Sequence, residues 1–484
     1  MKAGFHTTDI TPTFGMEKPG GYSKVFIDAI HDPLKVRAAV IEDDGEAVAL
    51  VGVDTCQIGS DALVNHVREE IERRVGIPAS HLLIGASHTH SGGPLWETGF
   101  EDLSEAPELV RTLFYEHSVN GDRLYSEYVG EQIVTGVCEA ARRRQDAELA
   151  IGSGHEDQVA HNRRFRMRNG RVYTHPGKGN ADIIGPAGPT DPEVGVISAW
   201  STDGEWLGCV VNYACHCTIH GSTVSADYVY DMERTIQGAM GSAAPVVFLQ
   251  GASGDVTQVD NLAITGPQFG ERWRRFVGTR VGAEAVKVMV TAERGRHTPV
   301  TACAADVRLS RRRPSQESIA TSREIVDEAL RSGRFTTEWT FAKERVLVDY
   351  ICEREPEFTT QAQAIQVGET LILSNSAELF CELGLDIKRR SPFPRTYVVE
   401  LANGCIGYVA PEHAFEPHEG GYETVLTSYS TAEVTAGTKL VDASLELAET
   451  LTPGESPSGC GIERPESVGA VEPWSYGVLG PDVD

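Results

Sequence analysis

The stretch Leu82-Leu83-Ile84-Gly85-Ala86-Ser87-His88-Thr89-His90-Ser91-Gly92-Gly93-Pro94 joins a short apolar run to a polar turn that carries two histidines. The run has the length of a buried strand, and an extended backbone would direct side chains i and i+2 to one side. Both imidazoles would then face one small volume. Neutral imidazole is the commonest metal ligand among protein side chains and also a proton shuttle. The pattern predicts a metal or proton-transfer site, unless the pair lies in an ordinary polar loop.

The composition is typical of a large globular protein. The chain has 484 residues and a net charge of −27 at pH 7, which allows one large α/β domain or two smaller ones. The acid excess repels phosphate backbones and anionic membranes, so we expect no nucleic-acid partner and no stable membrane association. The segment 1–9 lacks the apolar core of a secretory signal, and no later run reaches the ~18 apolar residues of a membrane helix. We therefore expect a soluble, cytoplasmic protein.

Polar motifs repeatedly follow apolar, strand-like runs. The runs 82–86, 207–214, 246–250, 370–374 and 397–401 are followed, respectively, by His88, by His216, by the turn 251–257, by Glu378 and by the segment 403–408. In open α/β sheets, ligands bind beyond the carboxyl ends of strands, because rigid strands aim the loops that follow them. We predict an α/β fold of mixed β-sheets flanked by helices, with the active site at the C-terminal ends of strands.

The chain is expected to divide near residue 452. Residues 1–452 would form one domain that includes a hairpin around 43–45, a helix over about 126–144 and a helical insert at about 314–354. The irregular segment 95–121 has the length of a lid or pocket wall. Residues 453–484 form a Pro/Gly-rich acidic tail, which we expect to be loosely ordered or to wrap the surface.

His88, His216 and Glu378 together predict a catalytic zinc site. Imidazole nitrogens, a carboxylate oxygen and an open position for water are what catalytic zinc prefers. Zinc lowers the pKa of bound water from ~15.7 towards ~7 and polarises a carbonyl, which permits hydrolysis at neutral pH. Each residue also has a structural interpretation: His216 as a hydrogen-bonded core histidine, and Glu378 as an acid favoured by the dipole at the start of a helix.

Two further segments are candidates for substrate binding. The basic patch 162–168 is conspicuous in so acidic a chain. It is either a solvated hairpin with Asn169-Gly170 at its tip, or the source of a guanidinium that holds a substrate oxygen. The glycines of the turn 251–257 would let backbone N–H groups approach an oxyanion, with the hydroxyl of Ser253 or Thr257 close by.

A set of dispersed motifs runs from Asp9-Ile10-Thr11-Pro12 to about Tyr422. They are Ser87-His88-Thr89-His90-Ser91-Gly92, Asn162-Arg163, Asn212-Tyr213-Ala214-Cys215-His216, Ser225-Ala226-Asp227-Tyr228, Gly254-Asp255-Val256, Ala377-Glu378-Leu379-Phe380, Tyr408-Val409 and Gly421-Tyr422-Glu423. In kind and order they resemble those of the neutral/alkaline (non-lysosomal) ceramidase family of zinc-dependent N-acyl amidases. The resemblance implies zinc bound by His88, His216, Glu378 and Tyr408. It also implies that His90 transfers protons or supports the zinc ligands, and that Arg163 and Tyr422 contact the substrate or the developing oxyanion.

Two departures from the family bear on the reaction. The family's Gly-Asp-Val-Ser-Pro-Asn reads Gly254-Asp255-Val256-Thr257-Gln258-Val259 here, which keeps a hydroxyl and loses the proline and asparagine. We therefore expect direct attack by zinc-bound water, with Thr257 as a hydrogen-bonding or substrate-positioning residue. The chain also resembles a short member that lacks the family's C-terminal β-sandwich domain, which favours a small soluble substrate over a lipid presented at a membrane.

The sequence thus predicts a zinc-dependent hydrolase that cleaves an N-acyl amide bond. Zinc-activated water would attack the carbonyl while His90 relays protons, and Arg163, Tyr408 and Tyr422 would stabilise negative charge. Two alternatives stay open. The enzyme would cleave an ester, lactone or glycosidic bond instead, or the protein would be a non-catalytic binding module whose loops zinc stabilises. Neither the substrate nor the oligomeric state follows from the sequence.

Overall fold

The apolar runs of the sequence form two main β-sheets in a computed structural model, which describes residues 1–95, 103, 105–221, 223–264 and 266–457. The larger sheet contains β1 (Lys2–Asp9), β2 (Lys35–Asp43), β3 (Glu46–Val53), β4 (Leu82–Ala86), β5 (Gln145–His155), β10 (Glu193–Ser201), β11 (Trp206–Tyr213), β12 (Val246–Gln250) and β14 (Arg294–Gly295). The second contains β15 (Val300–Ser310), β16 (Glu357–Val367), β17 (Thr370–Asn375) and β19 (Arg395–Val399).

Smaller sheets and helices complete the fold. The short strands pair as β6 (His161–Asn162) with β13 (Val256–Thr257), β18 (Glu378–Leu379) with β20 (Tyr408–Val409), and β7 (Arg164–Met167) with β8 (Val172–Thr174) and β9 (Ile183–Pro186). The helices are α1 (Asp61–Val75), α2 (Glu108–Tyr115), α3 (Arg123–Arg142), α4 (Tyr228–Met240), α5 (Glu271–Thr291), α6 (Gln316–Ser332), α7 (Thr337–Arg354), α8 (Cys381–Arg390) and α9 (Ala436–Thr450).

The sheets are mixed, as predicted. The larger one has the order β12-β11-β10-β5-β1-β2-β3-β4, with β14 on β5, and the second has the order β15-β16-β17-β19. Most neighbours are antiparallel, but β3 with β4, β11 with β12 and β17 with β19 are parallel. Strands β4 and β12 are buried along their whole length, which explains their continuous apolar sequences.

The expected hairpin is present between β2 and β3. Asp43 pairs with Glu46, and the two residues between them, Asp44 and Gly45, both have positive φ, 49° and 89°. A two-residue turn of this kind matches the right-handed twist of the strands and favours Asp-Gly.

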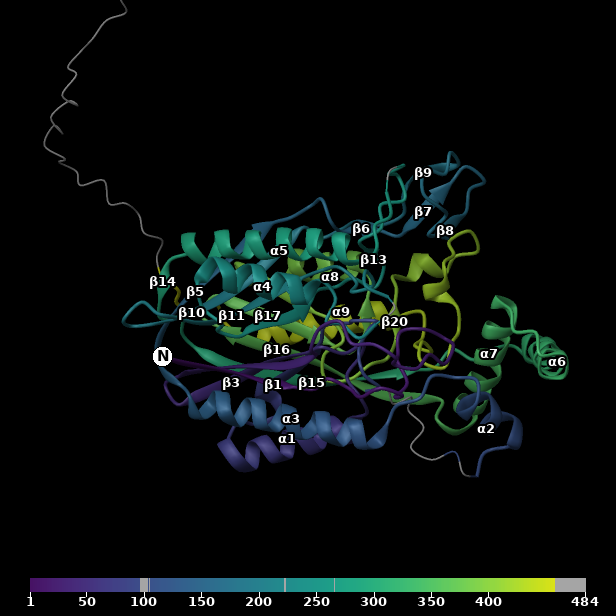
Figure 1. The fold of residues 1–484 in the computed structure, drawn as a ribbon, viewed down its shortest axis with the longest axis horizontal. Helices are drawn as coiled ribbons and strands as arrows, with labels where there is room; N and C mark the ends of the chain where they lie inside the picture. Colours follow the sequence, from purple (N-terminus) through teal and green to yellow (C-terminus); the bar gives the residue numbers. More distant parts are fainter. Residues whose placement is uncertain (96–102, 104, 222, 265, 458–484) are drawn as a thin grey trace, which may run out of the picture.

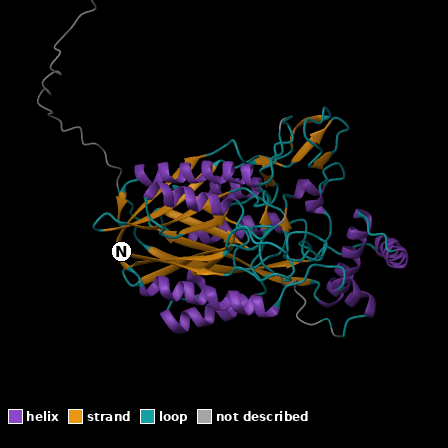
Figure 2. Ribbon diagram, viewed as in Figure 1, coloured by secondary structure: helices purple, strands orange, loops and turns teal. Residues whose placement is uncertain are grey.

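Two pairs of helices pack on the larger sheet from opposite sides of the molecule, and α9 packs on the second sheet (Figures 1 and 2). Helices α1 and α3 lie on one side, and α4 and α5 lie on the other. Between the sheets, Leu50 and Leu249 of the larger sheet belong to one apolar cluster with Ile372 and Val399 of the second. A Cβ at Gly52 would lie 2.5 Å from the carbonyl oxygen of Phe248, so this glycine permits close approach of β3 and β12. The two ends of the larger sheet are thereby brought together.

As a result, the carboxyl ends of strands from both sheets meet. The Ala86 N–H at the end of β4 donates to Leu401 O, 3.2 Å away, just after β19. The Glu400 N–H donates to Gln250 O at the end of β12, over 3.0 Å. The predicted fold class, mixed sheets flanked by helices in an α/β arrangement, is confirmed, and the polar motifs do gather where strands end.

Some expected segments differ from the prediction or lie outside the described residues. Helix α2 lies within the segment predicted to be irregular, whereas residues 96–102 and 104 of that segment are not described. Helices α6 and α7 occupy the expected helical insert. Of the predicted tail, residues 458–484 are outside the description.

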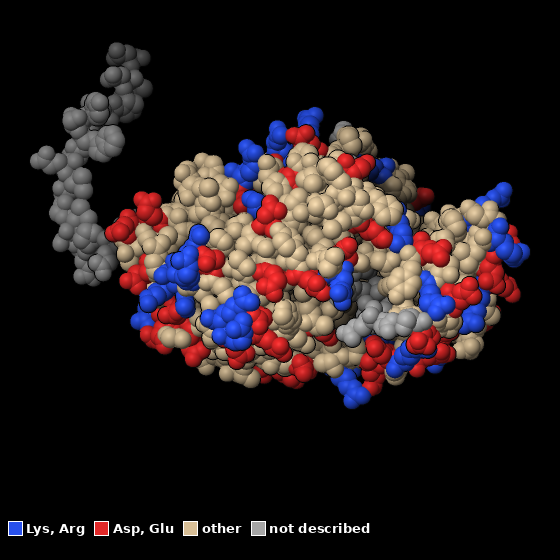
Figure 3. Space-filling model, turned by 60° about the horizontal axis from the view of Figure 1, so that its bottom comes forward, with Lys and Arg blue, Asp and Glu red and all other residues tan. Residues whose placement is uncertain are grey.

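The surface and the helices also bear on possible partners. On the face shown in Figure 3, acidic and basic side chains are intermixed. Within the described ranges, no helix has both the length and the apolar character needed to cross a membrane.

A buried ion cluster beside the larger sheet gives a test of the packing. Arg37 of β2 donates to both oxygens of Asp54 at 2.8 Å and to Glu233 of α4 at 2.7 Å, with all three side chains almost fully buried. Replacing Arg37 by Met leaves the buried Asp54 without its ion-pair partner and Glu233 with Lys35 alone, so the free energy of unfolding should fall by about 3–5 kcal/mol in urea denaturation. Arg166→Met removes an arginine that is half exposed and paired with Glu419, and should cost at most about 1 kcal/mol. Equal losses in the two variants would contradict the structure.

Candidate functional site

The two-histidine motif lies in a tight turn rather than in the extended backbone that we predicted. Strand β4 ends at Ala86, and His88 has φ 62°, a conformation that side chains other than glycine rarely adopt. Such strain costs of the order of 1–3 kcal/mol and persists where tertiary contacts impose it. Here the flanking Ser87 N–H donates to Val53 O at 2.9 Å, and the His90 N–H donates to Cys217 O at 3.1 Å. The turn still brings Nε2 of His88 and Nε2 of His90 to 3.3 Å.

Glu378 belongs to a strand and not to the start of a helix, so the expectation of a helix-terminal acid is wrong. It opens the short strand β18, in which it lies opposite Tyr408 of β20, and α8 begins only at Cys381. Its backbone is therefore held by pairing between two loops that follow β17 and β19. His216 follows the end of β11, as predicted.

His88, His216 and Glu378 form a candidate metal-binding group. Nε2 of His88 is 3.3 Å from Oε2 of Glu378, and Nε2 of His216 is 3.4 Å from the same oxygen. The donor atoms of the three residues all lie within 4.8 Å of one another, and all three side chains are buried. The structure thus brings together residues that are far apart in the sequence.

Hydrogen bonds to backbone carbonyls determine which ring nitrogen faces the group. Nδ1 of His88 donates to Cys56 O at 2.7 Å, and Nδ1 of His216 donates to Ser253 O at 2.8 Å. A nitrogen that donates in this way carries the proton, so Nε2 of a neutral ring presents its lone pair. Nε2 of His216 and Oε2 of Glu378 are buried without a hydrogen-bond partner. Two imidazole nitrogens and a carboxylate oxygen with unused lone pairs suit a divalent cation such as zinc.

The titration of these groups agrees with a cation-binding centre. Burial lowers the pKa of His216 well below its ordinary value, with Arg163 and His88 acting in the same direction, so this ring stays neutral. Burial also opposes a charge on His88, but the Glu378 carboxylate outweighs it and raises the pKa of His88. Burial favours the neutral form of Glu378, yet the two histidines hold its pKa low. Without a cation, His88 retains a proton beside Glu378, and a metal ion would compete with that proton.

His90 lies next to the group without belonging to it. Its Nδ1 donates to Gly20 O at 2.9 Å, which leaves Nε2 directed toward His88. Burial, reinforced by His88, lowers the pKa of His90 to about 3. The ring is therefore neutral and carries a lone pair on Nε2, as a proton acceptor requires.

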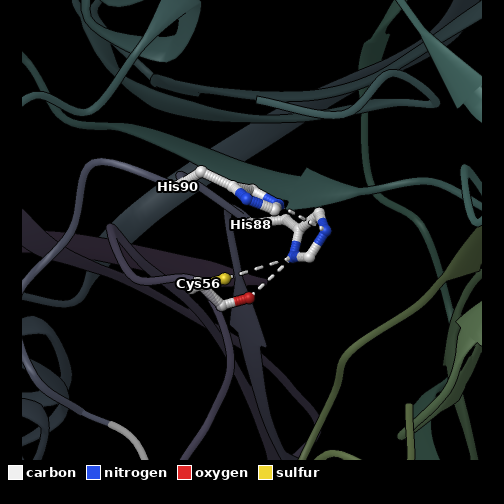
Figure 4. A group of neighbouring side chains, drawn as sticks. All are labelled: Cys56, His88 and His90. Atoms are coloured by element: carbon white, nitrogen blue, oxygen red, sulfur yellow. Dashed lines mark hydrogen bonds between the residues drawn. The ribbon is translucent and has the colours of Figure 1, made fainter. Parts of the chain in front are cut away.

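Cys56, His88 and His90 form a second group close enough to hold a metal (Figure 4). The Cys56 thiol, however, approaches Nδ1 of His88 at 4.0 Å, whereas His90 approaches Nε2 on the other side of the ring. Nδ1 already donates to Cys56 O. The group with Glu378 therefore has the better donor set.

Arg163, Tyr408 and Tyr422 form one cluster beside the centre. The two phenol oxygens are 3.2 Å apart, and the Arg163 guanidinium carbon is 5.4 Å from the Tyr408 ring centre and 5.0 Å from that of Tyr422. Arg163 is fully buried and donates to Glu423 at 2.8 Å and to Gly254 O at 2.7 Å. Burial raises the pKa of Tyr422 to about 12 although Arg163 opposes this shift. Arg163 thus points into the protein, whereas Arg166 of the same basic patch is exposed.

Thr257 lies near these residues but takes part in a different network. It is buried in β13, and its hydroxyl donates to Oε1 of Gln258 at 2.7 Å. The preceding residue, Val256, accepts the His216 N–H through its carbonyl at 3.1 Å. Thr257 therefore comes directly after Val256, whose carbonyl holds the backbone of the candidate ligand His216.

Glu400 is a buried residue of the site that sequence reasoning missed. Its carboxyl accepts from the Ser253 hydroxyl at 2.5 Å and from the Leu379 N–H at 2.7 Å. Burial raises its pKa to about 8, although His88 and the hydrogen bond from Ser253 act against this shift. Glu400 ties Ser253, whose carbonyl orients His216, to the residue after Glu378. An acidic side chain directly after the apolar run of β19 was the available signal.

Two solved ceramidase structures have a fold similar to that of this chain. A structure of neutral ceramidase from Pseudomonas aeruginosa matches with a TM-score of 0.66 and 18% identity over 94% of this chain and 76% of that chain. A ceramidase structure complexed with C2 matches with a TM-score of 0.67 and 16% identity over 96% and 77% of the two chains. The chain has the neutral ceramidase fold. The resemblance noted from the motifs is thereby confirmed for the fold of nearly the whole chain. The models of known families and the curated proteins gave no match to the sequence.

Metal binding at the group within this ceramidase fold should be visible in protein stability. Adding Zn²⁺ to metal-free protein should raise the free energy of unfolding, by about 2.7 kcal/mol when free zinc is 100 times its Kd. His88→Ala, His216→Ala and Glu378→Gln each remove a donor and should abolish most of this gain. His90→Ala should retain it, because His90 lies outside the group. Retention of the gain in His216→Ala would show that the metal binds elsewhere, and equal losses in all four variants would contradict the exclusion of His90 from the group.

Proposed function

We propose that the protein is a zinc-dependent hydrolase that cleaves the N-acyl amide bond of a small soluble substrate. The observation that carries this proposal is the convergence of His88, His216 and Glu378, with Nε2 of His216 and Oε2 of Glu378 buried and unpartnered. The ceramidase fold supports it, together with the resemblance of the motifs to a family of N-acyl amidases. Tyr408, opposite Glu378 in the β18–β20 pair, is proposed as the fourth ligand. The cytoplasmic location remains a prediction from the sequence.

In the proposed reaction, a bound zinc ion would polarise the substrate carbonyl and acidify water. His90 would accept a proton at Nε2, because its Nδ1 proton is committed to Gly20 O. The same nitrogen would then return the proton to the leaving amine. Because burial lowers the pKa of His90, the ring is neutral and its Nε2 lone pair can accept a proton.

Arg163 and Tyr422 would stabilise the negative charge that develops on the carbonyl oxygen. Glu423 and Gly254 O hold the guanidinium in one orientation, so no reorganisation is needed when charge appears. The Tyr422 phenol keeps its proton because burial raises its pKa to about 12, and it is therefore a hydrogen-bond donor. Thr257 would position the substrate and not act as a nucleophile, because its hydroxyl donates to an amide oxygen rather than to a base.

Matched substrates test the reaction class. Zinc-loaded protein should hydrolyse small N-acyl amides, and His90→Ala should lower kcat/KM by about 10²- to 10⁴-fold with zinc still bound. Arg163→Lys should lower kcat by a factor of about 10² or more, since one fixed donor to a developing oxyanion contributes this much. Arg166→Met, on the exposed part of the same hairpin, is the control and should leave kcat/KM unchanged.

The same assays distinguish the alternatives. Faster turnover of esters, lactones or glycosides than of matched amides, with the same dependence on His90, would support a zinc-dependent hydrolase that cleaves one of those bonds instead of an amide. Zinc binding without turnover of any of these substrates would refute the enzyme and favour a binding module.

A further inference from the structure

We propose that Glu400, acting with Ser253, is a positioning residue that sets the zinc affinity of the metal centre from outside the group of candidate ligands. The inference rests on the proposed function, because it concerns how the zinc site of that function is held in place. Neither residue belongs to the motifs that resemble those of the ceramidases.

A ring of hydrogen bonds joins the loops that follow β12 and β17. The Ser253 hydroxyl donates to Oε1 of Glu400 at 2.5 Å, and the Leu379 N–H donates to Oε2 of the same carboxylate at 2.7 Å. The Gly254 N–H donates to Leu379 O at 2.8 Å, which closes the ring. One carboxylate thus ties two loops that are more than a hundred residues apart in the sequence.

Each side of the ring reaches a candidate ligand. On one side, Nδ1 of His216 donates to the carbonyl of Ser253 at 2.8 Å, and this bond sets the orientation of the imidazole. On the other side, Leu379 directly follows Glu378 in β18. A shift of the ring would therefore change the separation of Nε2 of His216 from the carboxylate of Glu378. Groups that orient the ligands of a metal in this way contribute to its affinity.

The backbone holds Glu400 rigidly in this position. Its side chain is buried, and its N–H donates to Gln250 O at 3.0 Å. The next N–H, that of Leu401, donates to Ala377 O at 3.0 Å. Leu401 has φ 50°, a strained conformation for so large a residue, which persists because the contacts on both sides impose it. Glu400 is therefore preorganised to receive its two donors.

The bonds of Glu400 require a carboxylate. Both of its oxygens accept, whereas glutamine would offer one acceptor and one NH₂ group. An NH₂ group opposite Leu379 would place two donors face to face. An NH₂ group opposite Ser253 would add a second donor to a hydroxyl oxygen that already accepts from Nε2 of Gln250 at 2.7 Å, and the hydroxyl proton would lose its acceptor. Glutamine therefore cannot reproduce the ring in either orientation.

The zinc affinity of metal-free protein, measured by competition with a chromophoric chelator, tests this role. Glu400→Gln should weaken zinc binding by about 10- to 100-fold, the usual effect of losing a group that orients a metal ligand. Ser253→Ala keeps the carbonyl that accepts from His216 but removes the hydroxyl, and should also weaken binding. Because both changes act on one ring, the loss in the double variant should be smaller than the product of the two single losses.

Glu433→Gln is the matched control. The Glu433 carboxylate also accepts a backbone N–H, that of Ser310 at 2.9 Å, and a hydroxyl, that of Thr435 at 3.1 Å. It joins the end of β15 to the start of α9 and not the loops of the metal centre. This variant should unfold at lower urea concentration and keep the zinc Kd of the unmodified protein. If the role of Glu400 were structural only, Glu400→Gln would behave in the same way.

The possible outcomes separate this inference from the proposed function. An unchanged zinc Kd in Glu400→Gln, or losses that multiply in the double variant, would overturn the inference. If Glu400→Gln does not fold, Ser253→Ala decides: weaker zinc binding supports the inference and an unchanged Kd overturns it. Absence of zinc binding to the unmodified protein would overturn both proposals. Zinc affinity that depends on Glu400 without hydrolysis of any amide would support the inference and refute the amidase, and amide hydrolysis with zinc affinity independent of Glu400 would do the reverse.

Discussion

The structure depends on one electrostatic constraint, the burial of the Glu378 carboxylate against two imidazoles, of which only His88 retains a proton in the absence of a cation. The neutral His216 ring and the Glu378 carboxylate present their lone pairs to the same volume at 3.4 Å. Burying unpaired polar atoms is costly unless a hydrogen bond or a cation compensates. The surrounding hydrogen bonds preserve this arrangement, because the Nδ1 proton of each imidazole is donated to a backbone carbonyl on the outer side of the ring. A divalent cation bound between these atoms would compensate the cost of burying them.

The fold meets this constraint by bringing together strand ends from both sheets. Gly52 lets β3 and β12 approach closely, so the loops after β4 and β12 meet although the strands lie at opposite ends of the larger sheet. The second sheet stacks on the first and supplies Glu378 and Glu400 from the loops after β17 and β19. Glu400 then links both halves through Ser253 and Leu379. Rigid strands thus fix the backbone of each donor, which is the geometry that preorganised sites require.

Much of this arrangement can be predicted from sequence because it is locally encoded. The continuous apolar run of β4 indicates a buried strand, and Asp44-Gly45 indicates a two-residue turn. The candidate ligands His88, His216 and Glu378 follow such runs and do meet in the structure. Their backbone conformations could not be predicted, since the positive φ of His88 and the strand conformation of Glu378 arise from contacts with residues far away in the sequence. Residues 15–27, which reach His90 through Gly20, have no periodic pattern because irregular turns and single hydrogen bonds hold them, and Glu400 gains its role only when the two sheets stack.

Anomalous diffraction at the zinc absorption edge from crystals soaked in Zn²⁺ measures the central claim most directly. The donor geometry predicts one strong peak at about 2.0–2.2 Å from Nε2 of His88, Nε2 of His216 and a carboxylate oxygen of Glu378. The side chains of these residues should keep the orientations described above, with Nδ1 of both rings still on the backbone carbonyls. A peak between Cys56, His88 and His90 instead, or no peak near Glu378 in crystals that contain zinc, would contradict it.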